Sequence, residues 1–140
     1  MTLYLDTSQS DYIIIELRGP KKLIRKKIRA PKRQGEKLLP ALAALLAAQK
    51  IKLSALKKII VADRGGSFTS LRIGVVTANA LAYALNIPVE AASAQESLAP
   101  ATRTSSRLAW KKTKKFASHS LVEPLYERPP QIGKPAKALV

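Results

Sequence analysis

Apolar and polar residues alternate briefly in residues 2–8, and residues 12–19 are rich in β-branched residues, as is typical of β-strands. Three segments, 2–8, 12–19 and 21–30, are short, rich in Leu and Ile, and separated by turn residues such as Gly19 and Pro20. Segments of this kind joined by short turns pair as an antiparallel meander. In the third segment the apolar residues stand among cations, which is typical of an edge strand with a solvated face. The pattern therefore predicts three meandering strands.

Apolar positions after the meander recur every three or four residues in two places. The stretches Glu36–Lys50 and Thr69–Asn86 predict helices, with Pro40 tolerated in a first turn. The short apolar runs Leu56–Asp63 and 87–93 predict strands. A strand, helix, strand, helix, strand order after a meander predicts an α/β fold with a sheet of mixed direction, ordered as in the ribonuclease H and actin group.

Residues 99–140 give a weaker pattern. Turn residues are mixed there with a basic cluster around Trp110, and repeated prolines from Pro124 onward favour an extended tail. We therefore assign residues 1–98 to one folded lobe and residues 99–140 to a short basic segment followed by a C-terminal tail.

Both predicted helices are apolar on more than one side. In the second helix one stripe contains Leu71 and Val75, and a neighbouring stripe contains Ile73, Val76 and Tyr83. A sheet covers one side of a helix, so the other sides pack on each other, on a further layer, or on the helices of a partner. We assign partner contact to Leu38, Leu42, Leu45, Leu71, Val75, Ala78, Ala82 and Leu85.

The most informative feature of the composition is its strong positive charge. Lys and Arg number 25 against 9 Asp and Glu, which gives a net charge of +16 and points to a polyanionic partner. Cysteine is absent, which removes disulfides, thiolate nucleophiles and thiolate metal sites. Asp6 interrupts the N-terminal apolar residues, and no apolar run approaches membrane-spanning length. We expect a cytoplasmic protein with no membrane contact.

The cations concentrate in two blocks, one from Arg18 to Arg33 and one from Arg107 to Lys115. Such blocks can follow a phosphate backbone, and an aromatic residue beside them can stack on a base. The alternative is that they are solvated faces of a generally basic protein. Our candidate anion or RNA contacts are Arg72, Lys26, Lys27, Trp110, Lys111, Lys112, Lys114 and Lys115.

The turn before the second helix, "DRGGSFTS", resembles an anion-binding loop. It lacks the Lys of a P-loop and the spacing of a dinucleotide fingerprint. The simpler interpretation is a helix N-cap by Ser67 or Thr69, with Gly65 and Gly66 in conformations that other residues resist. Arg72 opposes the helix dipole in the first turn, so we expect it to pair with Asp63 or Asp6, or with an anionic ligand.

Catalytic chemistry has one candidate constellation. In a ribonuclease H-like fold, Asp6, Glu36 and Asp63 could converge on Mg²⁺ for phosphodiester cleavage. Each also has a structural explanation, as an Asx turn, a helix-dipole partner and a loop cap respectively. His119, the sole histidine, has no partner set for a triad or metal site. We predict no catalytic residue, no metal site and no cofactor.

The stretch "GGSFTSLRIGVVTANALAYALNIPV" resembles the TsaB family, also called YeaZ, of the bacterial tRNA threonylcarbamoyladenosine biosynthesis complex. Its hallmark is a Gly-Pro-Gly-Ser-Phe-Thr-Gly-Leu-Arg-Ile-Gly run, which residues 67–69 and 71–74 match as they stand. "LDTS", "GEKLLPAL" and "EPLYERPP" resemble the family's opening strand, first helix and C-terminal ending. Departures include Ser70 in place of Gly, and Gln34 and Gly35 in place of His and Ser.

The resemblance implies one actin-like (ASKHA) lobe, with most of the related second lobe missing. It implies a non-catalytic scaffold whose two helices dock on a TsaD-like catalytic subunit, with a TsaE-like ATPase as a further partner and with tRNA contact or a homodimer through the same helices as further options. Two alternatives from other classes are a Mg²⁺-dependent nuclease of the same fold and a stand-alone basic RNA-binding module.

Overall fold

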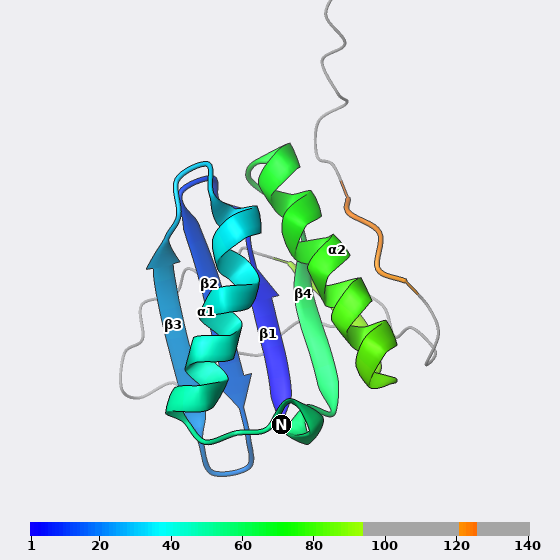
Figure 1. Ribbon diagram of the computed structural model, residues 1–140. Coiled ribbons are helices and arrows are strands. Elements are labelled where there is room, and N and C mark those ends of the chain that lie inside the picture. Colours follow the sequence, from blue (N-terminus) through cyan, green and yellow to red (C-terminus); the bar gives the residue numbers. More distant parts are fainter. Residues whose placement is uncertain (94–120, 126–140) are drawn as a thin grey trace, which may run out of the picture.

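The computed structural model describes residues 1–93 and 121–125 (Figure 1). Its strands and helices, in chain order, are β1 (Thr2–Asp6), β2 (Tyr12–Arg18), β3 (Leu23–Arg29), α1 (Gln34–Ala48), a 3₁₀ turn (Leu53–Ala55), β4 (Lys58–Arg64), α2 (Phe68–Leu85) and β5 (Val89–Ser93). Every predicted strand and helix of residues 1–93 is present. The predicted division at residue 98 lies outside the described residues.

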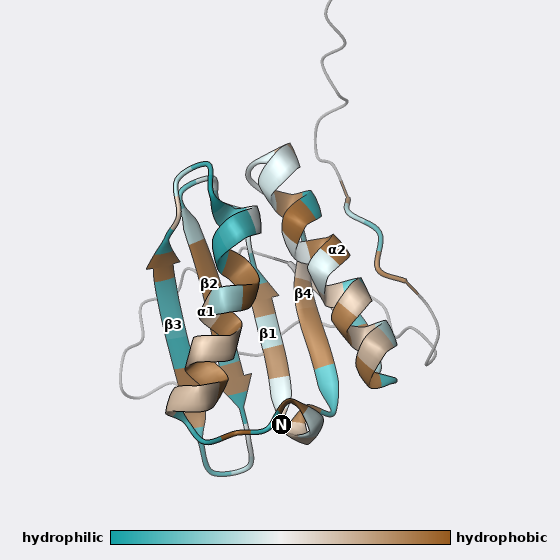
Figure 2. Ribbon diagram, viewed as in Figure 1, coloured by the Kyte–Doolittle hydropathy of each residue, from teal (hydrophilic) through white to brown (hydrophobic). Residues whose placement is uncertain are grey.

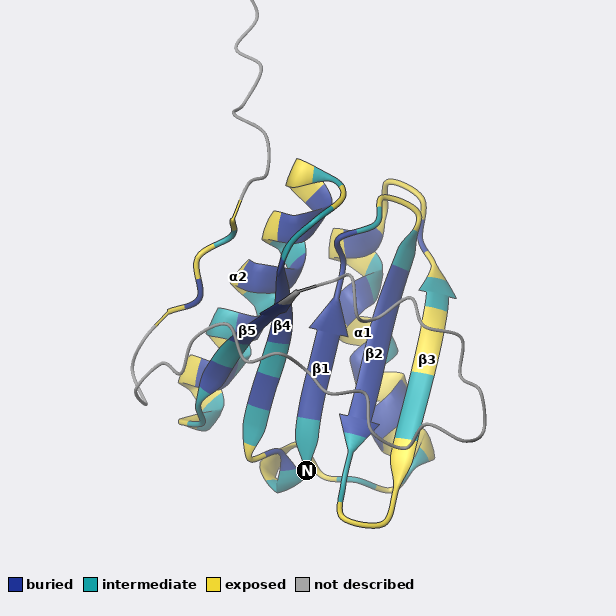
Figure 3. Ribbon diagram, turned by 180° about the vertical axis from the view of Figure 1, so that it is seen from behind, coloured by how far each residue is buried: buried dark blue, intermediate teal, exposed yellow. Residues whose placement is uncertain are grey.

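The sheet has the order β3-β2-β1-β4-β5. The first three strands pair antiparallel, whereas β4 runs parallel to β1 and to β5. This confirms the predicted mixed sheet and the predicted fold class. β3 forms one edge and is exposed along most of its length, in contrast to the buried central strands (Figure 3).

Both helices cover the same face of the sheet (Figures 1 and 3). The strand register places Leu3 beside Leu17 and Ile59, and these three side chains are buried on that face. α1 adds Leu38 and α2 adds Val75 to the same core. Burying a side chain of this size contributes roughly 1.5–3 kcal/mol, so this layer is the main source of stability.

The helix ends have local causes. The Ser67 hydroxyl caps α2 by accepting a hydrogen bond from the Ser70 N–H, and Asn86 ends the helix in the left-handed conformation with φ of 52°. α1 begins at Gln34, so Pro40 lies in its second turn and not in the first turn that the sequence suggested. Pro40 is on the exposed side of the helix.

Within the described residues, α2 is the one helix long and apolar enough to cross a membrane by length and composition. This revises the expectation that no segment reaches that length. Leu71, Val75 and Ala78 of this helix are buried against the sheet, as in the core helices of globular domains. The criterion is therefore weak evidence for a membrane span here.

Candidate partner-binding surface

A buried polar network fixes the N-terminal ends of α1 and α2 to the loop after β1. The Thr7 hydroxyl donates to the Ser70 carbonyl at 2.5 Å and accepts from the Gly74 N–H at 3.0 Å. The Gln34 side chain accepts from the Ser70 hydroxyl at 2.9 Å and donates to the Gln9 carbonyl. Because the side chains of Thr7, Gln34 and Ser70 are buried, losing one partner would leave the other unsatisfied, which favours this arrangement.

The glycine turn before α2 also fixes the start of this helix against the loop after β1. Gly65 and Gly66 both have positive φ, and a Cβ on Gly66 would overlap the Ser8 carbonyl. The Ser67 N–H donates to that carbonyl at 2.7 Å. The N-cap interpretation of this turn is therefore confirmed.

The two candidate aspartates lie at the ends of neighbouring parallel strands, and both already have partners. Asp6 accepts from the Ser8 N–H at 2.8 Å, and Asp63 forms an ion pair with Arg64 at 3.0 Å. The expected pairing of Arg72 with either carboxylate is not observed. Its guanidinium lies instead 5.9 Å from the centre of the Phe68 ring.

Glu36, the third member of the candidate constellation, is held away from the sheet. Its side chain is 68% exposed and pairs with Arg33 at 2.9 Å. Among the residues described by the structure, no group of three or more His, Asp or Glu side chains could hold a metal ion.

The stripe assigned to partner contact requires a correction. The structure buries seven of its members against the sheet and leaves the eighth half-buried beside the core: Leu38, Leu42, Leu45, Leu71, Val75, Ala78 and Ala82, and then Leu85. These side chains hold the domain together, so they are not available on its surface. The helical period identified the stripe, but it did not identify the side that faces the sheet.

The neighbouring stripes lie on the outside. We call the "outer helix surface" the exposed or half-exposed apolar residues Leu39 and Ala43 of α1 and Ile73, Val76, Ala80 and Tyr83 of α2. Leu39 is 51%, Val76 65% and Tyr83 84% exposed. Apolar residues accordingly appear on the outward side of both helices (Figure 2). A hollow of about 400 Å³ lies beside this surface and is lined by Gly35, Thr69, Arg72, Ile73, Val76 and Thr77.

A third side of α2 holds the described C-terminal segment, residues 121–125. The Asn79 side chain donates to the Val122 carbonyl at 2.8 Å and accepts from its N–H at 2.9 Å. Leu125 donates to the Asp63 carbonyl at 2.6 Å. The sequence analysis missed Asn79, although a lone amide in the middle of an apolar helix is a signal that could have pointed to such an anchor.

The predicted anion contacts fall in three places. Arg72 is exposed in the first turns of α2. Lys26 and Lys27 are exposed on β3, and the Lys27 ammonium lies 4.0 Å from the centre of the Tyr12 ring. The block around Trp110, with Lys111, Lys112, Lys114 and Lys115, lies outside the described residues.

The chain is similar to proteins of one family. Residues 29–110 match the family described as TsaD, tRNA N6-adenosine threonylcarbamoyltransferase. A curated relative, the tRNA threonylcarbamoyladenosine biosynthesis protein TsaB of Bacillus subtilis (strain 168), is 41% identical over 68 residues, which are 49% of this chain.

Two solved structures have the same fold over 66% of this chain at 32% identity: YeaZ from Pseudomonas aeruginosa, with a TM-score of 0.62, and a protein with similarity to peptidase YEAZ from Pseudomonas aeruginosa, with a TM-score of 0.63. The chain spans 30% of the length of the curated relative and 42–43% of the length of the two structures.

Proposed function

The chain belongs to the TsaB/YeaZ family, and from this premise we propose that it is a scaffold subunit in tRNA threonylcarbamoyladenosine modification. In this role it binds a TsaD-like catalytic partner through the outer helix surface. The same surface would pair two copies of the chain where the partner is absent. A TsaE-like ATPase would join through the complex, in the cytoplasm.

One observation carries this proposal: large apolar side chains are exposed on the outward side of two neighbouring helices. Val76 and Tyr83 are two turns apart on the same side of α2, and Leu39 is exposed on α1. Contiguous exposed apolar surface marks an interaction site more often than scattered single residues do. Tyr is also enriched among the residues that dominate binding energy, and small residues such as Ala80 let a partner helix approach closely.

We also propose that the chain does not catalyse a reaction and needs no cofactor or metal of its own. The support is that Asp6 and Asp63 are engaged by Ser8 and Arg64, while Glu36 pairs at the surface with Arg33. Phosphoryl transfer needs converging carboxylates around a metal ion and a cation near the phosphates. Purified chain incubated with ATP or RNA in Mg²⁺ should show no turnover. Turnover that disappears in Asp6→Asn would reject this part of the proposal.

The partner surface is tested by a charge placed on it. Val76→Glu should weaken binding of the TsaD-like protein of the same genome by at least about a hundredfold, because a carboxylate would be buried unpaired in the contact. The matched control is Leu23→Glu on β3, since Leu23 is 58% exposed and lies on the face of the sheet opposite the one that the helices cover. Binding is measured by titration of the two purified proteins, and circular dichroism checks that both variants fold.

The expected result is loss of binding in Val76→Glu and unchanged binding in Leu23→Glu. Equal affinity in Val76→Glu, Tyr83→Glu and the parent chain would reject the outer helix surface as the contact. A parent chain that binds no TsaD-like protein would reject the scaffold role itself.

A further inference from the structure

The strongest charge concentration in the described residues lies at one edge of the sheet. Of the sixteen residues from 18 to 33, nine are Lys or Arg and none is Asp or Glu. This range contains the end of β2, the turn after it, the whole of the edge strand β3 and the loop that leads to α1. No residue used for the proposed partner contact belongs to it.

Three of these nine cations have carboxylate partners. Arg18 and Arg25 both contact the buried Glu16, at 2.7 Å and 3.5 Å, and Arg33 pairs with Glu36. Within the described part of the chain, the other six have no carboxylate within 4.0 Å. We call them the basic edge: Lys21, Lys22, Lys26, Lys27, Arg29 and Lys32.

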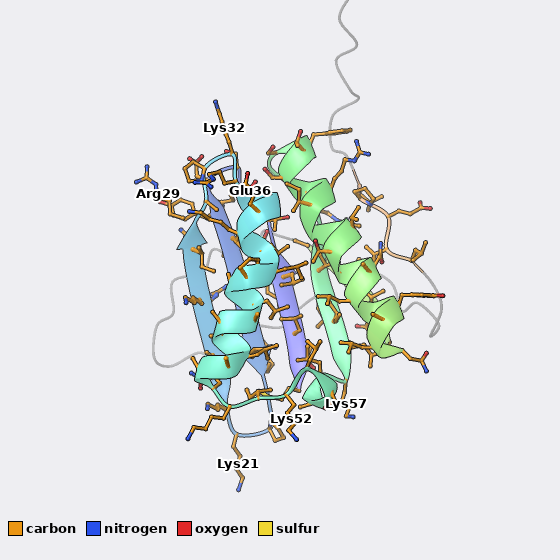
Figure 4. All side chains as sticks on the ribbon, in the orientation of Figure 1. Lys21, Arg29, Lys32, Glu36, Lys52 and Lys57 are labelled. Carbon is orange, nitrogen blue, oxygen red and sulfur yellow. The ribbon has the colours of Figure 1, made fainter. Side chains whose placement is uncertain are left out.

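The basic edge extends along the entire strand. Lys21 projects at one end of β3, and Arg29 and Lys32 project at the other (Figure 4). Side chains on one face of a strand recur about every 6.6 Å, which sets the spacing between Lys27 and Arg29. The register places Lys27 and Arg29 on the face of Ile14 and Tyr12, and Lys26 on the opposite face. The cations thus line both sides of one exposed edge.

Protection of an edge strand does not explain this arrangement completely. Lysines on an edge strand do prevent pairing with the edge of another sheet. Lys21, Lys22 and Lys32, however, lie in the turns, where there is no strand edge to protect. Unpaired charges of one sign repel each other and reduce stability, and a bound polyanion would remove that repulsion.

We propose that the basic edge binds the phosphate backbone of RNA. The proposal rests on the proposed function, which makes tRNA the relevant polyanion, and it assigns the tRNA contact to a surface separate from the outer helix surface. Lysine and arginine side chains neutralise phosphates without reading bases, so the contact supplies affinity and orientation and leaves sequence recognition to other residues. The contact with Tyr12 limits the positions available to the Lys27 ammonium.

The experiment compares two triple variants with the same change in net charge. The first, Lys26→Gln with Lys27→Gln and Arg29→Gln, removes the middle of the basic edge. The control, Lys50→Gln with Lys52→Gln and Lys57→Gln, removes three exposed cations outside β3. Affinity of the full chain for fluorescein-labelled tRNA is measured by anisotropy at salt concentrations between about 50 and 200 mM.

The first variant should bind tRNA at least about tenfold more weakly at low salt. Its plot of log affinity against log salt concentration should be less steep by about 2 units, because each lost phosphate contact removes roughly 0.7–0.9 from the slope. In the control variant, both the loss of tRNA affinity and the change in the salt slope should be less than about a third of those in the first variant. Equal losses in both variants would attribute binding to net charge alone and overturn the proposal.

Two further results would also overturn it. One is a parent chain that binds no tRNA, and the other is a first variant that loses binding to phosphatidylserine vesicles while it keeps tRNA binding. Failure here is distinguishable from failure of the scaffold role, because Val76→Glu should keep the parent's tRNA affinity and the triple variant should keep the parent's affinity for the TsaD-like protein.

Discussion

Val75 and Val76 are adjacent in α2 and have the same side chain, but their environments are opposite. Val75 is 2% exposed and packs in the core, whereas Val76 is 65% exposed. Consecutive residues in a helix point about 100° apart, so each begins a different stripe. The inner stripe continues through Ala78 and Ala82, and the outer one through Ala80 and Tyr83.

The contrast between Val75 and Val76 shows that apolar residues occur in α2 for two different reasons. The inner stripe is explained by folding, because its burial against the sheet stabilises the domain. The outer stripe gains nothing comparable within the described residues, so folding does not explain it. A third side, around Asn79, is explained by its hydrogen bonds to Val122. The sides of α2 therefore have different roles. Mutations in the inner stripe should lower stability, and mutations in the outer stripe should weaken partner binding.

The largest effect is expected for Ala78→Glu. Ala78 is fully buried, so the variant places an unpaired carboxylate and extra volume in the core. We expect a loss of about 4 kcal/mol or more in the free energy of unfolding, which is a large part of the 5–15 kcal/mol of a typical domain. Urea denaturation followed by circular dichroism measures this loss.

Ala80→Glu is the matched control, since the same substitution two residues later lies on the exposed side. It should leave the free energy of unfolding within about 0.5 kcal/mol of the parent. If Ala78→Glu folds as stably as Ala80→Glu, the division of α2 into inner and outer stripes is wrong.

The sequence predicted the fold well because its signals are local. Strand and helix periods, the Gly65-Gly66 turn and the Ser67 cap each depend on a few neighbouring residues. The sequence did not identify which side of α2 faces the sheet, because both stripes consist largely of Ala and other apolar residues. Amphipathic contrast normally orients a helix, and here it is almost absent.

Contacts between distant residues were also beyond the sequence analysis. Gln34 and Ser70 each depart from the family hallmark, and nothing in the sequence linked them. The structure joins them by a hydrogen bond between residues 36 positions apart. Asn79 and Val122 are 43 positions apart and are joined in the same way. Such pairs depend on the three-dimensional arrangement of α1, α2 and the C-terminal segment, which the local period does not encode.

Val75→Ala should have a smaller effect than Ala78→Glu. It removes two methyl groups from a buried position, which costs the transfer free energy and leaves a small cavity. The better helix propensity of Ala recovers a few tenths of a kcal/mol. We expect a net loss of about 2 kcal/mol in urea denaturation, with the affinity of the folded protein for a TsaD-like partner unchanged. A stability equal to that of the parent would show that this side chain contributes little to the core.

Val76→Ala should have the smallest effect on stability. Unlike Val75→Ala, it should weaken binding of the TsaD-like protein. The Val76 side chain is mostly in solvent, so truncation loses little burial, while Ala is the better helix former. The free energy of unfolding should therefore stay the same or rise by up to about 0.5 kcal/mol. Affinity for the TsaD-like protein should fall about tenfold, because a side chain in the centre of a contact contributes on the order of 1 kcal/mol or more. Both quantities are measured on one preparation, by denaturation and by titration. A stability loss equal to that of Val75→Ala would mean that the two valines have the same role, and the contrast between the two sides of α2 would no longer hold.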